Sequence, residues 1–443
     1  MLLTYNKPRL IVLPKTIDFF FVVSFLYFFT LHADLLQLRL AGFAIRANNL
    51  IGFALLVAMM LRYRKEFFML HRAIAIPLVV MTLCILISLI FSPYKKRCII
   101  FFFFYGMMLL VYFWLPYQML LKFKTKRVLK AYFASFICAG LITLFQLHRF
   151  AATKFIVRPA ALCYEPSYYA LYMTPFIVLI TFHYFFNQKE DFFLRKNLNL
   201  PTLICVHFLF AISCASSAFV LYLLLMALFF LFLFLEKFSS FRFQILKFIM
   251  GVASLVGILL ALFTKHVLSI LLKVVSVNYI IHHHSFTERF RSFKESWIIF
   301  KRFPFFGVGL GALPEYRFER WLAYDLNFPH YLSRSKILVS DRQLYFFESS
   351  NVVVEMLASL GIGGVLITLL FCSSFIYLGK KAAKINFMWT CNFFISTLLM
   401  LIILQINQGL LRTYVWVHVA LAFAYFVKTI QLSAQDPLEV ESA

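Results

Sequence analysis

Long apolar segments constrain this chain more than any other feature of its sequence. A helix needs roughly 18 to 25 apolar residues to cross a hydrocarbon core of about 30 Å, because each residue advances the helix by only about 1.5 Å. Segments of this kind recur from one end of the chain to the other, which predicts an all-α polytopic membrane protein with about 12 transmembrane helices. The segments lie near residues 17–33, 40–61, 73–91, 98–121, 128–147, 166–186, 199–214, 216–235, 245–263, 351–378, 386–404 and 409–427.

The composition supports the same class. Of the 443 residues, 63% are hydrophobic and 14% are charged, whereas a soluble domain carries about 25% charged residues. The net charge of +25 would favour nucleic acid as a partner of a soluble protein. Here no soluble basic domain is apparent, so we expect no nucleic-acid partner and interpret the basic residues as contacts with anionic membrane lipid. The eight cysteines form no CxxC pair and predict neither a disulfide frame nor a metal site.

Basic residues in the short connections predict the orientation of the chain. Lysine and arginine collect on the cytoplasmic side of membrane helices. Connections rich in them alternate with poorer ones, with Lys95-Lys96-Arg97 as the exception, so both termini are predicted to be cytoplasmic. The predicted organisation is transmembrane helices one to nine in 1–263, a large outward-facing loop in 264–350, helices ten to twelve in 351–427 and a short cytoplasmic tail in 428–443.

The large loop contains one segment with a clear helical period. Within 286–303, aromatic residues recur at helical spacing and charged residues stand between them. Such a pattern is typical of an amphipathic helix that lies in the plane of a membrane interface. We therefore expect this part of the loop to lie at the outer surface of the membrane.

Ionisable and polar residues gather at the predicted outer ends of the helices, where they are costly and often mark a functional site. A planar guanidinium can bind phosphate oxygens in pairs, although an arginine at an interface can also simply extend its charge to the headgroups. A glutamate before a proline can act as a general base, pair with a nearby arginine or support the start of a helix. The candidate residues are Arg158, Glu165, Arg289, Arg291, Glu348, Asn351 and Arg412.

Several of these residues stand in short motifs that follow one another along the chain. The motifs combine arginine or asparagine with proline and closely spaced glycines. They are Arg158-Pro159 with Glu165-Pro166-Ser167; Arg289 followed by Pro304 and Gly307-Val308-Gly309-x-Gly311; Asn351-x-x-x-Glu355 followed by Gly361 and Gly364; and Val415-Trp416-Val417 in the last predicted span.

In this order, and on either side of one large loop, the motifs resemble those of the bacterial O-antigen polymerase and O-antigen ligase superfamily. The resemblance covers roughly residues 158–425. It implies a glycosyltransferase-C-like fold in the inner membrane, with undecaprenyl-diphosphate-linked glycans as donor and acceptor and with no metal or cofactor. It also implies catalytic roles for Glu165, Arg289 and Glu348, and substrate-binding roles for Arg158, Arg291, Asn351 and Arg412. A chain-length regulator and a flippase are further implied partners.

Two alternatives to a polymerase of repeat units remain. Ligases of the superfamily carry histidine directly before the asparagine that begins the span after the loop, and this chain has Ser350-Asn351 there, which favours the polymerase. A polytopic transporter is the other alternative, because Arg46 with Asn48 and Asn49 falls inside the second predicted span. Charged residues at mid-membrane are typical of transport pathways.

Overall fold

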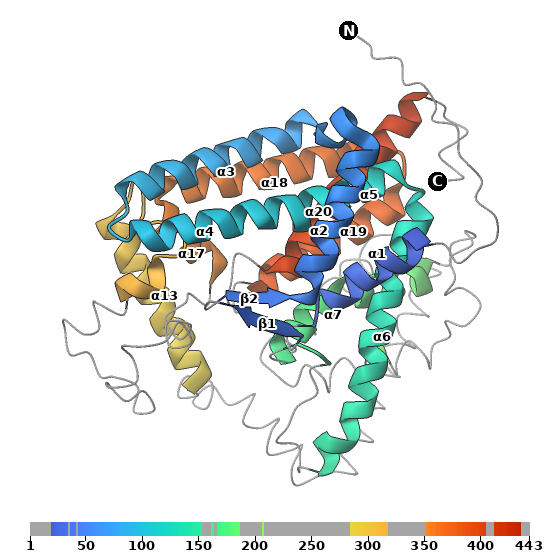
Figure 1. Cartoon of the computed structure of the whole chain (residues 1–443), viewed down its shortest axis with the longest axis horizontal. Helices are drawn as coiled ribbons and strands as arrows, with labels where there is room; N and C mark the ends of the chain where they lie inside the picture. The colour runs from blue at the N-terminus through green and yellow to red at the C-terminus, as the bar shows by residue number, and fades with distance from the viewer. Residues whose placement is uncertain are drawn as a thin grey trace, which may run out of the picture.

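A computed structural model shows the arrangement of the helices (Figure 1). It describes residues 19–33, 36–40, 43–152, 161–163, 166–186, 206–207, 284–317, 351–404 and 412–435. Within these ranges the ordered elements are helices, as predicted, except for one short two-stranded hairpin.

The elements follow the apolar pattern of the sequence closely in most places. Their bounds are α1 Phe19–Thr30, β1 Gln37–Leu40, β2 Phe43–Arg46, α2 Ala47–Tyr63, η1 Arg64–Phe68, α3 Arg72–Phe91, α4 Lys95–Met107, η2 Met108–Trp114, α5 Leu115–Lys122, α6 Thr125–Ala152, α7 Pro166–Phe186, α13 His284–Arg302, α17 Val352–Leu360, α18 Ile362–Ala383, α19 Phe387–Leu404 and α20 Thr413–Gln435.

Five helical segments of the described chain are long and apolar enough to cross a membrane. They are Arg72–Phe91, Lys95–Lys122, Thr125–Gln146, Ile362–Ala383 and Thr413–Ala434. Shorter apolar helices accompany them. The predicted spans near 199–214, 216–235 and 245–263 fall outside the described residues, apart from 206–207.

The second predicted span begins later than its apolar content suggested. Residues 37–46 form the antiparallel hairpin β1–β2, in which Gln37 pairs with Arg46 and Leu40 with Phe43. In β1, polar and apolar residues alternate with the period of two that suits a strand, whereas the first three residues of β2 are all apolar. Helix α2 starts at Ala47, with Arg46 as its N-cap residue. Arg46 therefore lies before the helix and not at its centre.

The predicted span near 351–378 consists of two helices. Helix α17 ends at Leu360, and α18 begins at Ile362 and is a candidate membrane span by itself. Gly361 joins them with a φ of +61°, a conformation that glycine adopts without the steric cost of a side chain. The chain direction thus changes where an unbroken helix was predicted.

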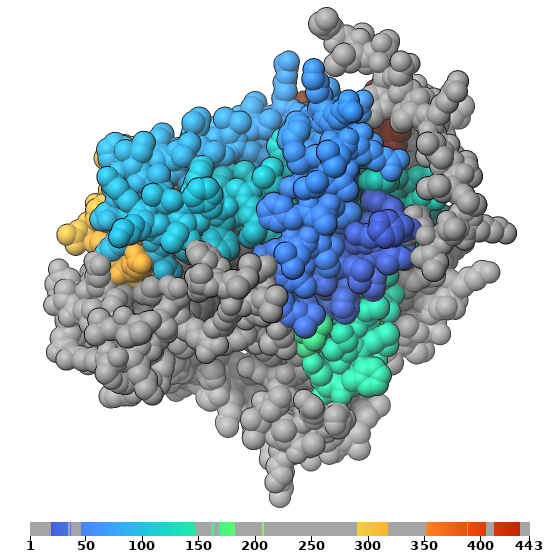
Figure 2. All heavy atoms as spheres, viewed as in Figure 1, coloured from blue at the N-terminus to red at the C-terminus, as the bar shows by residue number. Residues whose placement is uncertain are grey.

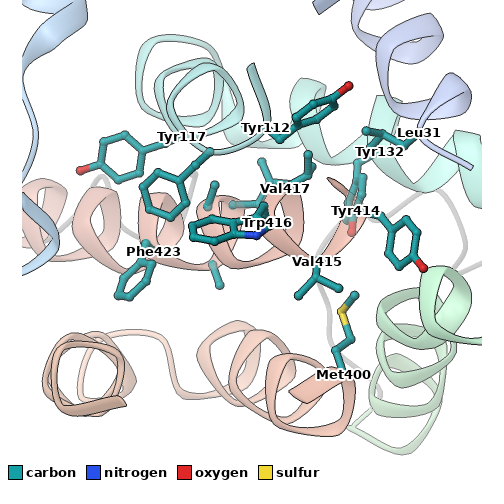
Figure 3. Close-up of a cluster of buried hydrophobic side chains, with 14 of the residues drawn as sticks. Leu31, Tyr112, Tyr117, Tyr132, Met400, Tyr414, Val415, Trp416, Val417 and Phe423 are labelled. Carbon is teal, nitrogen blue, oxygen red and sulfur yellow. The ribbon is translucent and has the colours of Figure 1, made fainter. Parts of the chain in front are cut away.

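The helices pack around a core rich in aromatic side chains. Helix α20 lies against α5 and η2, α1 against α6, α7 against α19, and α3 against α18. Trp416, from the predicted Val415-Trp416-Val417 motif, lies in the middle of this core, between the helix that carries Tyr112 and the helix that carries Met400 (Figure 3). The rings of Trp416 and Phe113 meet edge to face at 6.0 Å. The motif in the last span therefore contributes packing.

Other apolar side chains face away from the core. Residues of α2, α3 and α4 lie side by side on one broad face of the molecule (Figure 2). Along α3 the exposed apolar residues recur every three or four positions, which places them on one stripe of the helix. A stripe of this kind on a helix of membrane-spanning length is a lipid-facing surface. The α3 residues are Ile76, Val79, Leu83, Ile87, Ile90 and Phe91.

Candidate functional site

The glycine-rich segment Pro304–Gly311, here called the glycine loop, follows α13 and lies on the end of α17. The amide of Val308 donates to the carbonyl of Ala358 at 2.9 Å, and the amide of Gly309 donates to that of Ser359 at 2.9 Å. In the other direction, the amide of Ile362 donates to the carbonyl of Pro304 at 2.7 Å. The loop thus partners backbone groups that the end of α17 and the start of α18 leave open.

Two glycines of the predicted motifs make this approach possible. A Cβ atom on Gly307 would lie 2.3 Å from the backbone carbonyl carbon of Ser359, and one on Gly361 would lie 2.5 Å from that of Phe305. Both glycines also have positive φ angles, +66° and +61°. The two motifs are therefore two sides of one backbone contact, although 54 residues separate these glycines in the sequence.

Two serines at the C-terminal end of α3 form hydrogen bonds to the same junction. The hydroxyl of Ser88 lies 2.6 Å from the carbonyl oxygen of Phe306 and 2.9 Å from that of Ser359. One turn later, the hydroxyl of Ser92 donates to the carbonyl of Val308 at 2.5 Å. Sequence reasoning missed both serines, because a lone serine in an apolar helix gives no sign of a distant partner.

Arg97 is held by the segment that follows the glycine loop. Its Nε donates to the carbonyl of Gly311 at 2.8 Å, and its guanidinium lies 3.5 Å from the carboxylate of Glu315. The basic triplet Lys95-Lys96-Arg97 was the exception to the predicted charge pattern. The contacts of Arg97 with Gly311 and Glu315 give this residue of the triplet a structural role.

A carboxylate shared between two arginines lies on the neighbouring side of α13. Glu295 accepts from Nε of Arg291 at 3.0 Å and pairs with Nη2 of Arg317 at 2.8 Å. Arg317 is buried and also donates to the hydroxyl of Ser292 at 3.2 Å. Arg291, a predicted substrate-binding residue, is thus engaged with Glu295, and a phosphate there would compete with that carboxylate.

Of the predicted site residues other than Arg291 and Arg412, the structure describes two and leaves three outside its described ranges. Asn351 is the N-cap of α17, where its side-chain oxygen accepts from the amide of Val354 at 3.0 Å. Arg289 belongs to α13, two positions before Arg291. Arg158, Glu165 and Glu348 lie outside the described residues.

A second cluster of predicted residues forms where α7 and α20 begin. The guanidinium of Arg412 lies 3.7 Å from the centre of the Tyr168 ring, a cation–π contact. Tyr168 is in the first turn of α7, which starts at Pro166 directly after Glu165. The structure therefore brings Arg412 beside the helix that begins with the predicted Glu-Pro motif.

His32, which follows α1, contacts α7 at Tyr172, one turn beyond Tyr168. Its ring stacks on that of Tyr172 with centres 4.9 Å apart, and its side chain is fully buried. Neither ring nitrogen has a side-chain hydrogen-bond partner in the part of the chain that the structure describes. A buried polar group without a partner costs free energy and calls for an explanation. Sequence reasoning missed His32, since it is a single histidine at the end of an apolar run.

His418 of α20 shows what a satisfied buried histidine looks like in this protein. Its Nδ1 lies 3.2 Å from the hydroxyl of Tyr132, and its Nε2 lies 2.8 Å from the hydroxyl of Ser396. Both nitrogens are therefore partnered inside the core. Among the described residues, His32 therefore differs from His418 in having no side-chain partner for either ring nitrogen.

The residues that the structure describes contain no group of three or more histidine, cysteine, aspartate or glutamate side chains arranged to hold a metal ion. The charged groups described at the two junctions include Arg97, Arg291, Arg317 and Arg412, with the carboxylates of Glu295 and Glu315. Guanidinium groups bind phosphate and carboxylate by paired hydrogen bonds. The arrangement thus offers positive charge without a metal ligand set.

The fold and these junctions define a polytopic helical membrane protein in which a glycine loop packs across a broken helix. Residues 201–369 match the family model described as O-antigen ligase. This match includes α13, the glycine loop, α17 and the first turns of α18, and it confirms the resemblance to the O-antigen ligase and polymerase superfamily. A comparison with curated proteins finds no match.

Proposed function

We propose that the protein polymerises undecaprenyl-diphosphate-linked oligosaccharide repeat units into O-antigen or exopolysaccharide at the outer face of the bacterial inner membrane. The observation that supports this most is the contact of Arg412 with the first turn of α7. It puts a permanent positive charge next to the helix that the Glu165-Pro166 motif begins. Glycosyl transfer needs a positive charge for the donor diphosphate and a base for the acceptor hydroxyl, and these two groups must lie close together.

The proposed reaction is a single glycosyl transfer. The acceptor hydroxyl oxygen forms a bond to the anomeric carbon of the donor chain, and the bond from that carbon to the diphosphate oxygen breaks. The electron pair leaves with the lipid diphosphate, and arginines stabilise its charge. In this scheme Arg289, Arg158 and Arg412 contact the diphosphate, with Arg291 and Asn351 as further binding residues. Glu165 or Glu348 takes the hydroxyl proton.

The proposed orientation places the glycine loop and the starts of α7 and α20 on the outer side, with both termini in the cytoplasm. Substrate then arrives from a flippase, and a chain-length regulator is a second proposed partner. The scheme uses no metal and no cofactor. Its chemistry rests on arginines, which keep their charge at any physiological pH.

A ligase is the second candidate function, since the matched family model is described as O-antigen ligase. Ser350 before Asn351 favours the polymerase over it, because a ligase of the superfamily is expected to carry histidine there. The transporter loses the support of Arg46, which occupies the N-cap position before α2, although Asn48 and Asn49 do lie within that helix.

Deletion of the gene tests the proposal, with the surface glycan separated on a gel. A polymerase mutant should keep a band with a single repeat unit and lose the longer ladder. Wild type and Arg62→Ala should restore the ladder, because Arg62 lies at the far end of α2 and contacts only Tyr63 among ring systems in the described structure. Arg289→Ala should fail to restore it.

The other outcomes of the deletion decide between the candidates. Loss of the single-unit band together with the ladder would replace the polymerase with the ligase. An unchanged glycan pattern would contradict both functions.

A further inference from the structure

Helix α13 presents its aromatic side chains away from the protein. Phe290, Phe293 and Trp297 are 61%, 41% and 39% exposed. On the opposite face, Ser292 and Ser296 are buried where the helix packs near α17. The apolar Ile299 is buried on the protein side as well, but a surface helix of a soluble protein would not also expose several large aromatic residues on its outer face.

The buried serines explain how α13 approaches its neighbour. Small residues between helices let two backbones come close, and this type of contact is common where lipid surrounds the helices. The aromatic side chains remain 39% to 61% exposed. A row of large apolar side chains on an otherwise polar helix marks an interaction surface.

The aromatic surface continues from α13 onto the membrane helices. Phe305 and Phe306 of the glycine loop are exposed, and the Phe306 ring stacks on that of Phe91 with centres 4.3 Å apart. Phe91 is the last residue of α3, and the exposed Ile362 is the first of α18. Both helices are candidate membrane spans. The exposed aromatic residues therefore join the lipid-facing sides of two spans at one end.

Basic side chains accompany these aromatic residues. Lys294, Lys301 and Arg302 are exposed, and the Nζ of Lys301 lies 6.0 Å from the centre of the Trp297 ring. Charged residues throughout α13 keep it out of the candidate spans of the described chain. A helix with aromatic and basic residues on its free side suits the level of the lipid headgroups.

We propose that α13 and the glycine loop form a membrane-docking surface that inserts into the leaflet at the α3 C-terminal end. Its occupant is the phospholipid surface. Phe290, Phe293, Trp297, Phe305 and Phe306 enter the leaflet, and the basic residues contact the phosphates. This surface holds α13, which carries Arg289, at headgroup level. The proposal rests on the membrane location of α3 and α18 and not on the glycan reaction.

Quenching of Trp297 fluorescence tests the proposal in the full-length protein. The protein is reconstituted in vesicles of phosphatidylethanolamine and phosphatidylglycerol, either unmodified or brominated at a shallow or a deep acyl position. Wild type minus Trp297→Phe gives the emission of Trp297 alone. We expect shallow bromine to quench this emission by about half or more, deep bromine to quench it less, and aqueous acrylamide to have little effect.

Trp416→Phe provides the matched control, because Trp416 is buried in the core, and its difference emission should respond little to shallow bromine or acrylamide. Strong quenching of Trp297 by acrylamide without quenching by brominated lipid would overturn the proposal, since the helix would then face water. Protection from both quenchers would also overturn it, because another protein surface, such as a second copy, would then cover α13. Thermal unfolding of Trp297→Phe confirms that the variant is folded.

Discussion

The two junctions described above treat their polar groups differently. At the glycine loop, Ser88, Ser92 and Arg97 each contact a backbone carbonyl of the segment that they hold. Where α1, α7 and α20 meet, the ring nitrogens of His32 have no side-chain partner among the described residues, and Arg412 is already engaged, with one contact on the Tyr168 ring. Saturated polar contacts specify one geometry, whereas unsatisfied buried groups favour binding something else. The comparison indicates a structural role for Ser88, Ser92 and Arg97, and it supports our proposal that substrate also binds where α7 and α20 begin.

The largest effect should come from a side chain that prevents the backbone contact between the glycine loop and Gly361. In Gly361→Val, the new side chain would collide with the backbone of Phe305, and a positive φ is a strained conformation for valine that costs about 1–3 kcal/mol even without a collision. We expect a sharp fall in Tm or no monodisperse protein after size-exclusion chromatography. Gly106→Ala is the control, since its Cβ meets nothing within 4 Å. An unchanged Tm of Gly361→Val would show that the loop does not dock in this way.

A large functional effect with little effect on the fold is expected at Arg412. If its charge stabilises the leaving diphosphate, Arg412→Ala should slow glycosyl transfer by roughly 100-fold or more. Arg412→Lys keeps the charge but loses the planar group, so it should recover only part of the rate. The measurement is polymer formed per unit time by purified enzyme with lipid-linked repeat units. Equal rates for wild type and alanine would remove Arg412 from the site.

The two buried histidines should respond in opposite directions to leucine. His32→Leu removes a buried polar group that has no side-chain partner, and should raise the free energy of unfolding by about 1 kcal/mol while reducing polymer formation. His418→Leu removes the hydrogen bonds of His418 to the hydroxyls of Tyr132 and Ser396. It should lower the free energy of unfolding by about 1–3 kcal/mol. Thermal unfolding and activity of both variants, measured side by side, check this. A Tm that falls equally in both would mean that His32 is only structural.

The smallest effect concerns pH and lies at the other end of α3. His71 caps this helix by accepting from the amide of Ala73 at 3.2 Å. Burial and, secondarily, the charge of Lys381 lower the pKa of His71 from its ordinary value of about 6.5. Because the folded pKa is the lower one, its contribution to stability is full above about pH 6.5 and falls as the pH drops below that value. His71→Asn should keep the cap and flatten this part of the Tm–pH curve. An identical curve for the variant would exclude His71 as the source.

Sequence reasoning was most accurate where the pattern is local. The period of aromatic residues predicted a helix over 286–303, and α13 spans His284–Arg302. The glycine motifs were recognised, but their common purpose was not, because Gly307 and Gly361 meet only in the folded chain. The same holds for Ser88 and for the partners of Arg97. Apolar content alone also concealed the hairpin of β1 and β2, in which only β1 alternates polar and apolar residues.

The candidate site was predictable in part. Arg412 was recognised as a charged residue before an apolar run, and the structure adds its contact with Tyr168. Asn351 was interpreted as a substrate ligand, and the structure gives it a helix cap, a role that its position before an apolar segment also permits. His32 gave no signal, because the absence of a partner is a property of three-dimensional surroundings.

Because α3 is hydrogen-bonded to the glycine loop, the large loop should not be exchangeable between related proteins by itself. A chimera that replaces only the large loop would separate Phe306 and Val308 from Ser88 and Ser92, whose hydroxyls bind their carbonyls. The residue pair Arg97 and Glu315 would be divided as well. A functional graft should therefore carry the second half of α3 and the start of α4 along with the loop, α17 and Gly361, although more than 160 residues lie between Arg97 and the start of the loop.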